Sequence, residues 1–258
     1  MNILVCNDDG INALGLKQLV LTMSEVADVY VLAPDGERSG NSHHISINKK
    51  MHFEKKDIPG AKEAYSLAGT PVDCVHLAMN YFFKDRIDLV ISGINQGKNA
   101  STDIIYSGTI AAAREAFIRG FPAVASSLGS YTGQDYLVAS EFTRDIVLQY
   151  YLSKNNTDYF ININVPAIPK EEIKGIKVCH KSTFVSYEDK YEISEDNDGT
   201  YIRMVPAADH IFENNKDLDV DIVAMSEGYV SVTPLYNQHI NKDKLKEVEE
   251  FLTLLPII

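Results

Sequence analysis

The chain has 258 residues, of which 45% are hydrophobic and 23% are charged, as in an ordinary globular protein. This composition argues against a disordered or fibrous protein. With 24 basic and 36 acidic residues the formal net charge is −12. A surface of this sign repels long polyanions, so we expect no nucleic-acid polymer as a partner.

The spacing of the cysteines and the hydropathy of the chain indicate the cellular compartment. Cys6, Cys74 and Cys179 are far apart and form no C-x-x-C pair, which favours buried thiols over a disulfide framework or a zinc site. No stretch approaches the ~18 apolar residues of a membrane span, and no basic leader precedes the first apolar run. We therefore expect a cytoplasmic protein with no membrane partner.

Short β-branched runs alternate with longer segments whose apolar residues recur at helical spacing. In chain order the pattern predicts a strand at 2–6, a helix at 14–26, a strand at 28–32, a helix at 71–82, a strand at 89–92, a helix at 108–119, a strand at 123–127, a helix at 136–152 and a strand at 159–164. This alternation predicts an α/β fold with a Rossmann-like, mostly parallel sheet flanked by helices.

Beyond Pro166 the pattern changes to shorter pieces. Strand-like segments fall at 176–179, 183–187, 201–205 and 229–234, a hairpin tip at 194–199 and a last helix at 242–254. We expect a β-rich extension rather than more of the same sheet. The predicted division is a core of residues 1–170 and an extension of residues 171–258 that is not an independent domain.

Functional residues of an open parallel sheet gather at the carboxyl ends of its strands. The loop after the first predicted strand reads Asn7-Asp8-Asp9-Gly10. Both carboxylates could cap the next helix. Two adjacent carboxylates also repel each other unless a cation lies between them, so a metal role is equally open.

The loop at 33–44 follows the second predicted strand and is rich in small polar residues. Most such loops are simply solvated, and we expect His43 and His44 at the surface, since adjacent histidines share one zinc ion poorly. Ser39, Asn41 and Ser42 fit better as neutral oxygen ligands or phosphate donors.

Two further loops combine glycines with polar side chains. In Ser92 to Asn99 the glycines could serve only a turn. Tyr106-Ser107-Gly108-Thr109 opens an alanine-rich helix, and N-capping alone would explain Ser107. The whole cluster also offers N–H groups, hydroxyls and the positive end of the helix dipole to a phosphate.

The oxygen ligands of these loops form a set that suits a hard cation such as Mg2+ or Mn2+. Hydrolysis of phosphate monoesters demands accelerations of up to ~10^21-fold, or roughly 28 kcal/mol. A helix dipole supplies about 1 kcal/mol and positioning about 7–11 kcal/mol. A metal that polarises the phosphoryl group is the natural remaining contribution.

Other classes fit less well. A response-regulator receiver also carries an acidic pair after its first strand, but it is shorter and needs a phosphoacceptor aspartate where this chain has Gly93 and Asn95. The absence of G-x-G-x-x-G after the first strand and of G-x-S-x-G disfavours dinucleotide binding and serine hydrolysis. A non-catalytic nucleotide sensor stays open, because only turnover separates it from an enzyme.

Five motifs in order resemble the SurE family of survival-protein nucleotidases over nearly the whole chain, most specifically from Met1 to Phe117. They are Asn7-Asp8-Asp9-Gly10, Pro34-Asp35 with Arg38-Ser39-Gly40, Gly69-Thr70-Pro71-Val72-Asp73-Cys74, residues 92–99 and Tyr106-Ser107-Gly108-Thr109. The resemblance implies a Rossmann-like core, an extension used in homodimer or homotetramer assembly, and a metal-dependent phosphatase acting on nucleoside 5′- and 3′-monophosphates.

The resemblance also implies one divalent ion per subunit, Mg2+ or Mn2+, and assigns roles to residues. The metal ligands would be Asp8, Asp9, Ser39 and Asn95, the first two also catalytic, and the substrate would contact Asn41, Asn95, Gly97, Asn99, Ser107, Gly108 and Thr109. Ser101 departs from the family, which usually has glycine there. We expect water to attack phosphorus with Asp9 accepting its proton, while covalent attack by Asp8 or Asp9 stays an alternative.

Overall fold

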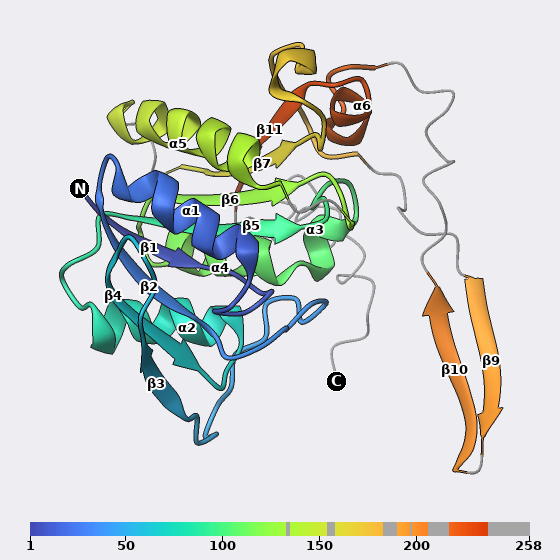
Figure 1. The fold of residues 1–258 in the computed structure, drawn as a ribbon, viewed down its shortest axis with the longest axis horizontal. Helices are drawn as coiled ribbons and strands as arrows, with labels where there is room; N and C mark the ends of the chain where they lie inside the picture. Colours follow the sequence, from blue (N-terminus) through green and yellow to red (C-terminus); the bar gives the residue numbers. More distant parts are fainter. Residues whose placement is uncertain (133–134, 154–157, 183–189, 197, 206–216, 237–258) are drawn as a thin grey trace, which may run out of the picture.

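The computed structural model describes residues 1–132, 135–153, 158–182, 190–196, 198–205 and 217–236. A nine-stranded sheet carries the fold, with strand order β3-β4-β2-β1-β5-β6-β7-β11-β8 (Figure 1). Its central strands are β1 (Asn2–Cys6), β2 (Asp28–Pro34), β4 (Ala61–Leu67), β5 (Leu89–Gln96), β6 (Ala123–Leu128) and β7 (Phe160–Val165). Neighbouring pairs from β4 to β7 are all parallel. The predicted α/β fold with a mostly parallel sheet is confirmed.

Helices cover both faces of this sheet. They are α1 (Leu14–Ser24) and α5 (Leu137–Leu152) on one face, and α2 (Pro71–Leu77), the π-helical turn η1 (Ala78–Phe82) and α4 (Gly108–Ile118) on the other (Figure 1). Strand β1 shows why two cores form, because Ile3 and Val5 pack on the α1 side whereas Leu4 and Cys6 pack on the α4 side. A strand buried on both faces needs such a continuous apolar run.

The edge strand β3 and its neighbour β4 escaped the sequence prediction. Strand β3 (Phe53–Lys56) pairs antiparallel with β4, and both carry charged side chains. An edge strand has one hydrogen-bonded neighbour and exposed faces, so it needs no apolar run. The short helix α3 (Asp103–Tyr106) was not predicted either.

The expectation for the chain beyond residue 166 was wrong in one respect. Strand β11 (Val230–Leu235) pairs antiparallel with β7, and β8 (Ile176–Val178) pairs parallel with β11, so both extend the main sheet. Strands β9 (Lys190–Asp196) and β10 (Gly199–Val205) form a separate hairpin. The sequence predicted its tip and strand β10, but not strand β9. The 3-10 turn η2 (Lys170–Glu172) and helix α6 (Asp221–Ser226) complete the described elements.

Two predicted elements, the strand at 183–187 and the helix at 242–254, lie outside the described residues. Among the helices that are described, none combines the length and apolar character needed to cross a bilayer.

Candidate active site

Loops from the carboxyl ends of β1, β2 and β5 are joined by hydrogen bonds. The Arg38 N–H donates to the Asp8 carbonyl at 2.7 Å, and the Ile11 N–H donates to the Pro34 carbonyl at 2.8 Å. The Gln96 N–H, at the end of β5, donates to Asp9 Oδ2 at 3.2 Å. The sheet therefore brings three segments to one edge, as the strand-end argument predicts. They are the acidic pair, the loop at 33–44, which we call the second loop, and the loop at 92–99, which we call the third loop.

Asp8 is buried and lies at the start of α4. The Thr109 hydroxyl donates to its Oδ1, and the backbone N–H groups of Gly108 and Thr109 contact the same carboxylate. A Cβ at Gly108 would lie 2.9 Å from Asp8 Oδ2, so glycine is required for this approach. Burial raises the pKa of Asp8, and the hydrogen bonds from Thr109 and Gly108 oppose that rise.

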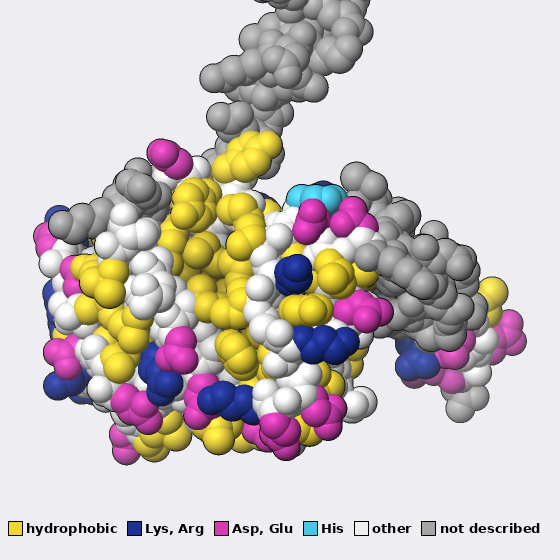
Figure 2. All heavy atoms as spheres, turned by 90° about the horizontal axis from the view of Figure 1, so that it is seen from above, with side chains coloured by type: hydrophobic (Ala, Val, Ile, Leu, Met, Phe, Trp, Pro, Cys, Tyr) yellow, Lys and Arg dark blue, Asp and Glu magenta, His cyan; other side chains and the backbone are white. Residues whose placement is uncertain are grey.

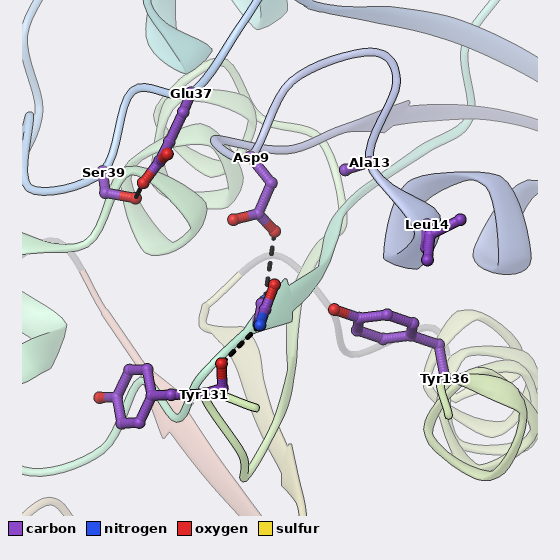
Figure 3. A pocket seen from close by; sticks show the side chains of 8 residues that line it. Asp9, Ala13, Leu14, Glu37, Ser39, Tyr131 and Tyr136 are labelled. Atoms are coloured by element: carbon purple, nitrogen blue, oxygen red, sulfur yellow. Dashed lines mark hydrogen bonds between the residues drawn. The ribbon is translucent and has the colours of Figure 1, made fainter. Parts of the chain in front are cut away.

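Asp9 faces a hollow of about 480 Å³ (Figure 3). The residues that line it are Asp9, Ala13, Leu14, Glu37, Ser39, Gln96, Tyr131 and Tyr136, and we call it the acidic hollow. Burial, followed by repulsion from Asp8, raises the pKa of Asp9 from 3.8 to about 7. A group that titrates near neutral pH in a hollow is a candidate for acid–base chemistry.

Ser39 lies in the acidic hollow with Asp9, as predicted for a shared site. Its hydroxyl donates to Glu37 Oε1 at 3.0 Å (Figure 3). Asn95 precedes the lining residue Gln96 but does not itself line the hollow. It is buried, and its amide donates to the Gly97 carbonyl at 2.7 Å.

Asn99 takes part in a buried amide network. Its N–H donates to Asn164 Oδ1 at 2.8 Å, its side-chain amide donates to Ser127 Oγ at 2.9 Å, and its carbonyl accepts from Asn162 at 2.8 Å. These bonds tie the third loop to β6 and β7. The role of Asn99 as a substrate contact stays a prediction.

Asn41 and Ser107 bond to their own loops. The Asn41 amide donates to the Arg38 carbonyl at 2.7 Å, and Ser107 Oγ accepts from the Ile110 N–H at 3.1 Å as the N-cap of α4. Their predicted contacts with substrate phosphate are likewise untested.

The two histidines of the second loop differ. His44 is exposed, as expected. The expectation for His43 was wrong, because its ring is only 28% exposed and its Nε2 lies 3.1 Å from the buried carboxylate of Glu115 on α4. Burial opposes ionisation of Glu115, but hydrogen bonds from His43 and Arg119 lower its pKa below the ordinary value.

The oxygen donors at the carboxyl edge of the sheet suit a hard cation. The pKa of Asp9 is raised first by burial and then by repulsion from the neighbouring Asp8 carboxylate, and a divalent cation would oppose both effects. Ser39 and Asn95 add neutral oxygen atoms of the kind that Mg2+ and Mn2+ accept. Over the described ranges no group of three or more His, Cys, Asp or Glu side chains is arranged to hold a metal, so a mixed oxygen set is the alternative that the residues offer.

The sequence did not single out four of the lining residues as functional. Glu37, Gln96, Tyr131 and Tyr136 belong to loops or loop ends whose packing depends on partners far along the chain. Glu37 and Gln96 lie in the same loops as Ser39 and Asn95, so closeness in sequence to these two residues is a usable signal. For Tyr131 no sequence signal existed.

Fold and site together define an α/β protein with an acidic, oxygen-rich site at the carboxyl edge of a parallel sheet. The family model described as "Survival protein SurE" matches residues 3–188. The chain belongs to the SurE family.

Individual relatives agree over almost the full length. The chain is 36% identical to the 5′-nucleotidase SurE of Syntrophomonas wolfei, covering 99% of this chain and 97% of that protein. It is 41% identical to the 5′-nucleotidase SurE of Clostridium botulinum strain Alaska E43, covering 97% and 99%. The crystal structure of the SurE protein from Aquifex aeolicus superposes with a TM-score of 0.83 at 32% identity, covering 98% of this chain and all of that one.

Proposed function

We propose that this chain is a divalent-metal-dependent 5′-nucleotidase, which hydrolyses nucleoside 5′-monophosphates, and 3′-monophosphates, to nucleoside and phosphate. The observation that carries the proposal is the Asp9 carboxylate, which opens onto the acidic hollow beside the buried Asp8. The names of the full-length relatives support the same activity.

Asp8, Asp9, Ser39 and Asn95 would hold one Mg2+ or Mn2+ ion. When bound, the ion supplies charge stabilisation for the phosphoryl oxygens and makes a water more acidic. Asp9 is the group that we assign to accept the proton of the attacking water, because it faces the hollow. The Thr109 hydroxyl donates to Asp8, which fixes the Asp8 carboxylate against the start of α4.

The substrate phosphate would lie between the ion and the first turn of α4. Ser107, Gly108 and Thr109 would share their N–H and hydroxyl donors between the phosphate and Asp8. Asn41 would contact the substrate from the second loop. Gly97 and Asn99 would contact it from the third loop, where they follow Asn95 in sequence.

Residues after 170 are proposed to serve assembly into a homodimer or homotetramer in the cytoplasm. The β9–β10 hairpin exposes Ile193 (71%) and Ile202 (69%), and a two-stranded hairpin is marginal in water without a partner surface. Figure 2 shows a further band of hydrophobic side chains on the face seen from above. Exposed apolar patches of this kind support protein contacts.

The test is phosphate release from AMP, GMP, CMP and UMP with Mg2+ or Mn2+ and with a chelator. We expect metal-dependent release by the wild type and a loss of about 10^2-fold or more in Asp8→Asn and Asp9→Asn, as for removal of other key catalytic groups. Asp28→Asn, at an exposed aspartate on β2, is the matched control. Nucleotide binding without release under any metal would favour the sensor.

A further inference from the structure

The rim of the acidic hollow carries an exposed aromatic ring. Tyr131 is 58% exposed and lines the same hollow as Asp9 and Ser39. In Figure 3 both tyrosine rings lie below Asp9, that of Tyr131 at the left and that of Tyr136 at the right. The two residues differ in exposure, because Tyr136 is buried in the wall, 5% exposed, whereas Tyr131 is exposed to solvent and also lines a second hollow, beside Lys98 and Ile168.

The third loop fixes this ring in place. A Cβ at Gly97, where φ is +105°, would lie 2.3 Å from Tyr131 Cε1, so only glycine lets the ring approach the backbone so closely. The Gln96 side-chain amide donates to the Tyr131 carbonyl at 2.5 Å. The Lys98 ammonium lies 5.7 Å from the ring centroid. The segment that contacts Asp9 through the Gln96 N–H therefore also positions the ring.

The chemistry of the hollow says what such a ring can bind. Asp9 and Glu37 make its floor acidic, so it attracts a phosphate monoester only at the cation, and affinity for the rest of the substrate has to come from uncharged contacts. A nucleobase presents a flat π-face whatever its identity, and removal of a stacking aromatic side chain weakens binding by about 5- to 150-fold. A sugar phosphate without a base has nothing to stack.

We propose that Tyr131 is the stacking platform for the nucleobase, and that it sets the preference for nucleoside monophosphates over sugar phosphates. The proposal rests on the nucleotidase function and deepens it. The proposal predicts similar affinities for nucleotides with different bases. Stacking on an aromatic ring distinguishes purines from pyrimidines mainly by the area of the base.

The test compares AMP with ribose 5-phosphate, which keeps the phosphate and sugar and lacks the base. In Tyr131→Ala we expect KM for AMP to rise by roughly 5- to 150-fold with kcat within about twofold. KM for ribose 5-phosphate should stay within about twofold of wild type, since no base is present. Tyr131→Phe keeps the ring and should retain the wild-type KM for AMP.

Tyr81→Ala is the matched control, because it removes another exposed tyrosine ring, 72% exposed, from η1. An unchanged KM for AMP in Tyr131→Ala, or an equal rise for AMP and ribose 5-phosphate, would overturn the platform while leaving the nucleotidase intact. Wild-type release from ribose 5-phosphate with none from AMP would overturn the nucleotidase function and the platform together.

Discussion

Asp8 and Asp9 are adjacent in sequence, yet the fold gives them different surroundings. Asp8 points at the first turn of α4 and receives the Thr109 hydroxyl. Asp9 points into the acidic hollow and receives one backbone N–H, from Gln96. The helix dipole and several donors compensate the Asp8 charge, whereas the charge of Asp9 meets two other carboxylates, Asp8 and Glu37. Burial raises the pKa of both carboxylates, but repulsion from neighbouring carboxylates adds to this rise only at Asp9.

Replacing Asp9 by Asn should stabilise the protein in chelator at pH 8. The pKa of Asp9 is about 7 in the fold against 3.8 in the unfolded chain. Between these values the unfolded state binds fewer protons, so Asp9 lowers stability as pH rises from 4 to 7, and the full effect is present above pH 7. We expect a gain of one to a few kcal/mol, or about 3–8 °C, at pH 8 and little gain at pH 4.

Thermal unfolding of wild type and Asp9→Asn in EDTA at the two pH values measures this difference. Asp28→Asn, 53% exposed on β2, should stay within about 0.5 kcal/mol of wild type at both. A destabilised Asp9→Asn at pH 8 would show that its carboxylate supports the metal-free fold. Addition of Mg2+ or Mn2+ should raise the midpoint of wild type more than that of the variant.

At the scale of elements, the loop after β2 is held against the helical face by contacts far from the sheet. The Ser42 N–H donates to the Tyr106 carbonyl at 2.9 Å, and its hydroxyl donates to the Ile105 carbonyl at 2.9 Å. His43 then contacts Glu115 on α4. These contacts fix the loop that carries Ser39 to the helix that supports Asp8.

His43→Ala should loosen this loop and His44→Ala should not. Loss of a hydrogen bond to the Glu115 carboxylate is expected to cost about 1.5–3 kcal/mol of stability. Because Ser39 is displaced with the loop, kcat/KM for AMP should fall by about 10-fold or more. The neighbouring His44 has an exposed side chain, so its alanine variant is the matched control. Equal behaviour of the two variants in unfolding and kinetics would contradict this role for the His43 contact.

The predictability of these elements from sequence follows from burial. Strand β1 is buried on both faces and therefore has an apolar run that identifies it with its bounds. Strand β4 contains Lys62 and Glu63 and is only partly buried, so its pattern is weak. Strands β8 and β11 were recognised as strands, but their place in the main sheet depends on pairing with β7, which local patterns do not encode.

The same reasoning applies to the site. The strand-end rule brought Asp8, Asp9 and Ser39 to one edge without knowledge of the loops. It could not foresee that Thr109 would donate to Asp8, or that Tyr131 would pack on Gly97, because these contacts join segments 101 and 34 residues apart. Residues that close a hollow are set by long-range packing, whereas residues at strand ends are set by topology.

At the scale of the whole molecule, the chain after residue 170 supports the core as well as extending it. Asp221, the first residue of α6, is fully buried. Its carboxylate accepts from the Ser101 N–H at 2.9 Å, from the Ser182 N–H at 3.2 Å and from the Ile222 N–H at 2.8 Å. Burial still outweighs these donors and raises the pKa of Asp221. The extension thereby holds the third loop where it turns toward α3.

Ser101 shows what this support does. Its φ is +56°, a left-handed conformation that costs a non-glycine residue about 1 kcal/mol or more. The bond from the Ser101 N–H to Asp221 stabilises the turn in this conformation, so a residue of α6 offsets the backbone cost in the site loop.

Asp221→Ala should therefore destabilise the whole molecule. It leaves the buried N–H groups of Ser101 and Ser182 without their acceptor, at about 1–3 kcal/mol each, and we expect a loss of roughly 2–5 kcal/mol. Asp219→Ala, two residues earlier at an exposed side chain, should lose less than about 0.5 kcal/mol. Chemical denaturation of both variants measures the difference, and phosphate release from AMP below the unfolding transition reports on the loop. If α6 packs on the sheet without holding the third loop, the Asp221→Ala and Asp219→Ala variants will unfold alike and keep wild-type kcat/KM. If Asp221 anchors the loop, its variant will lose activity in native buffer as well, because Asn95 and Gly97 lie on the same loop.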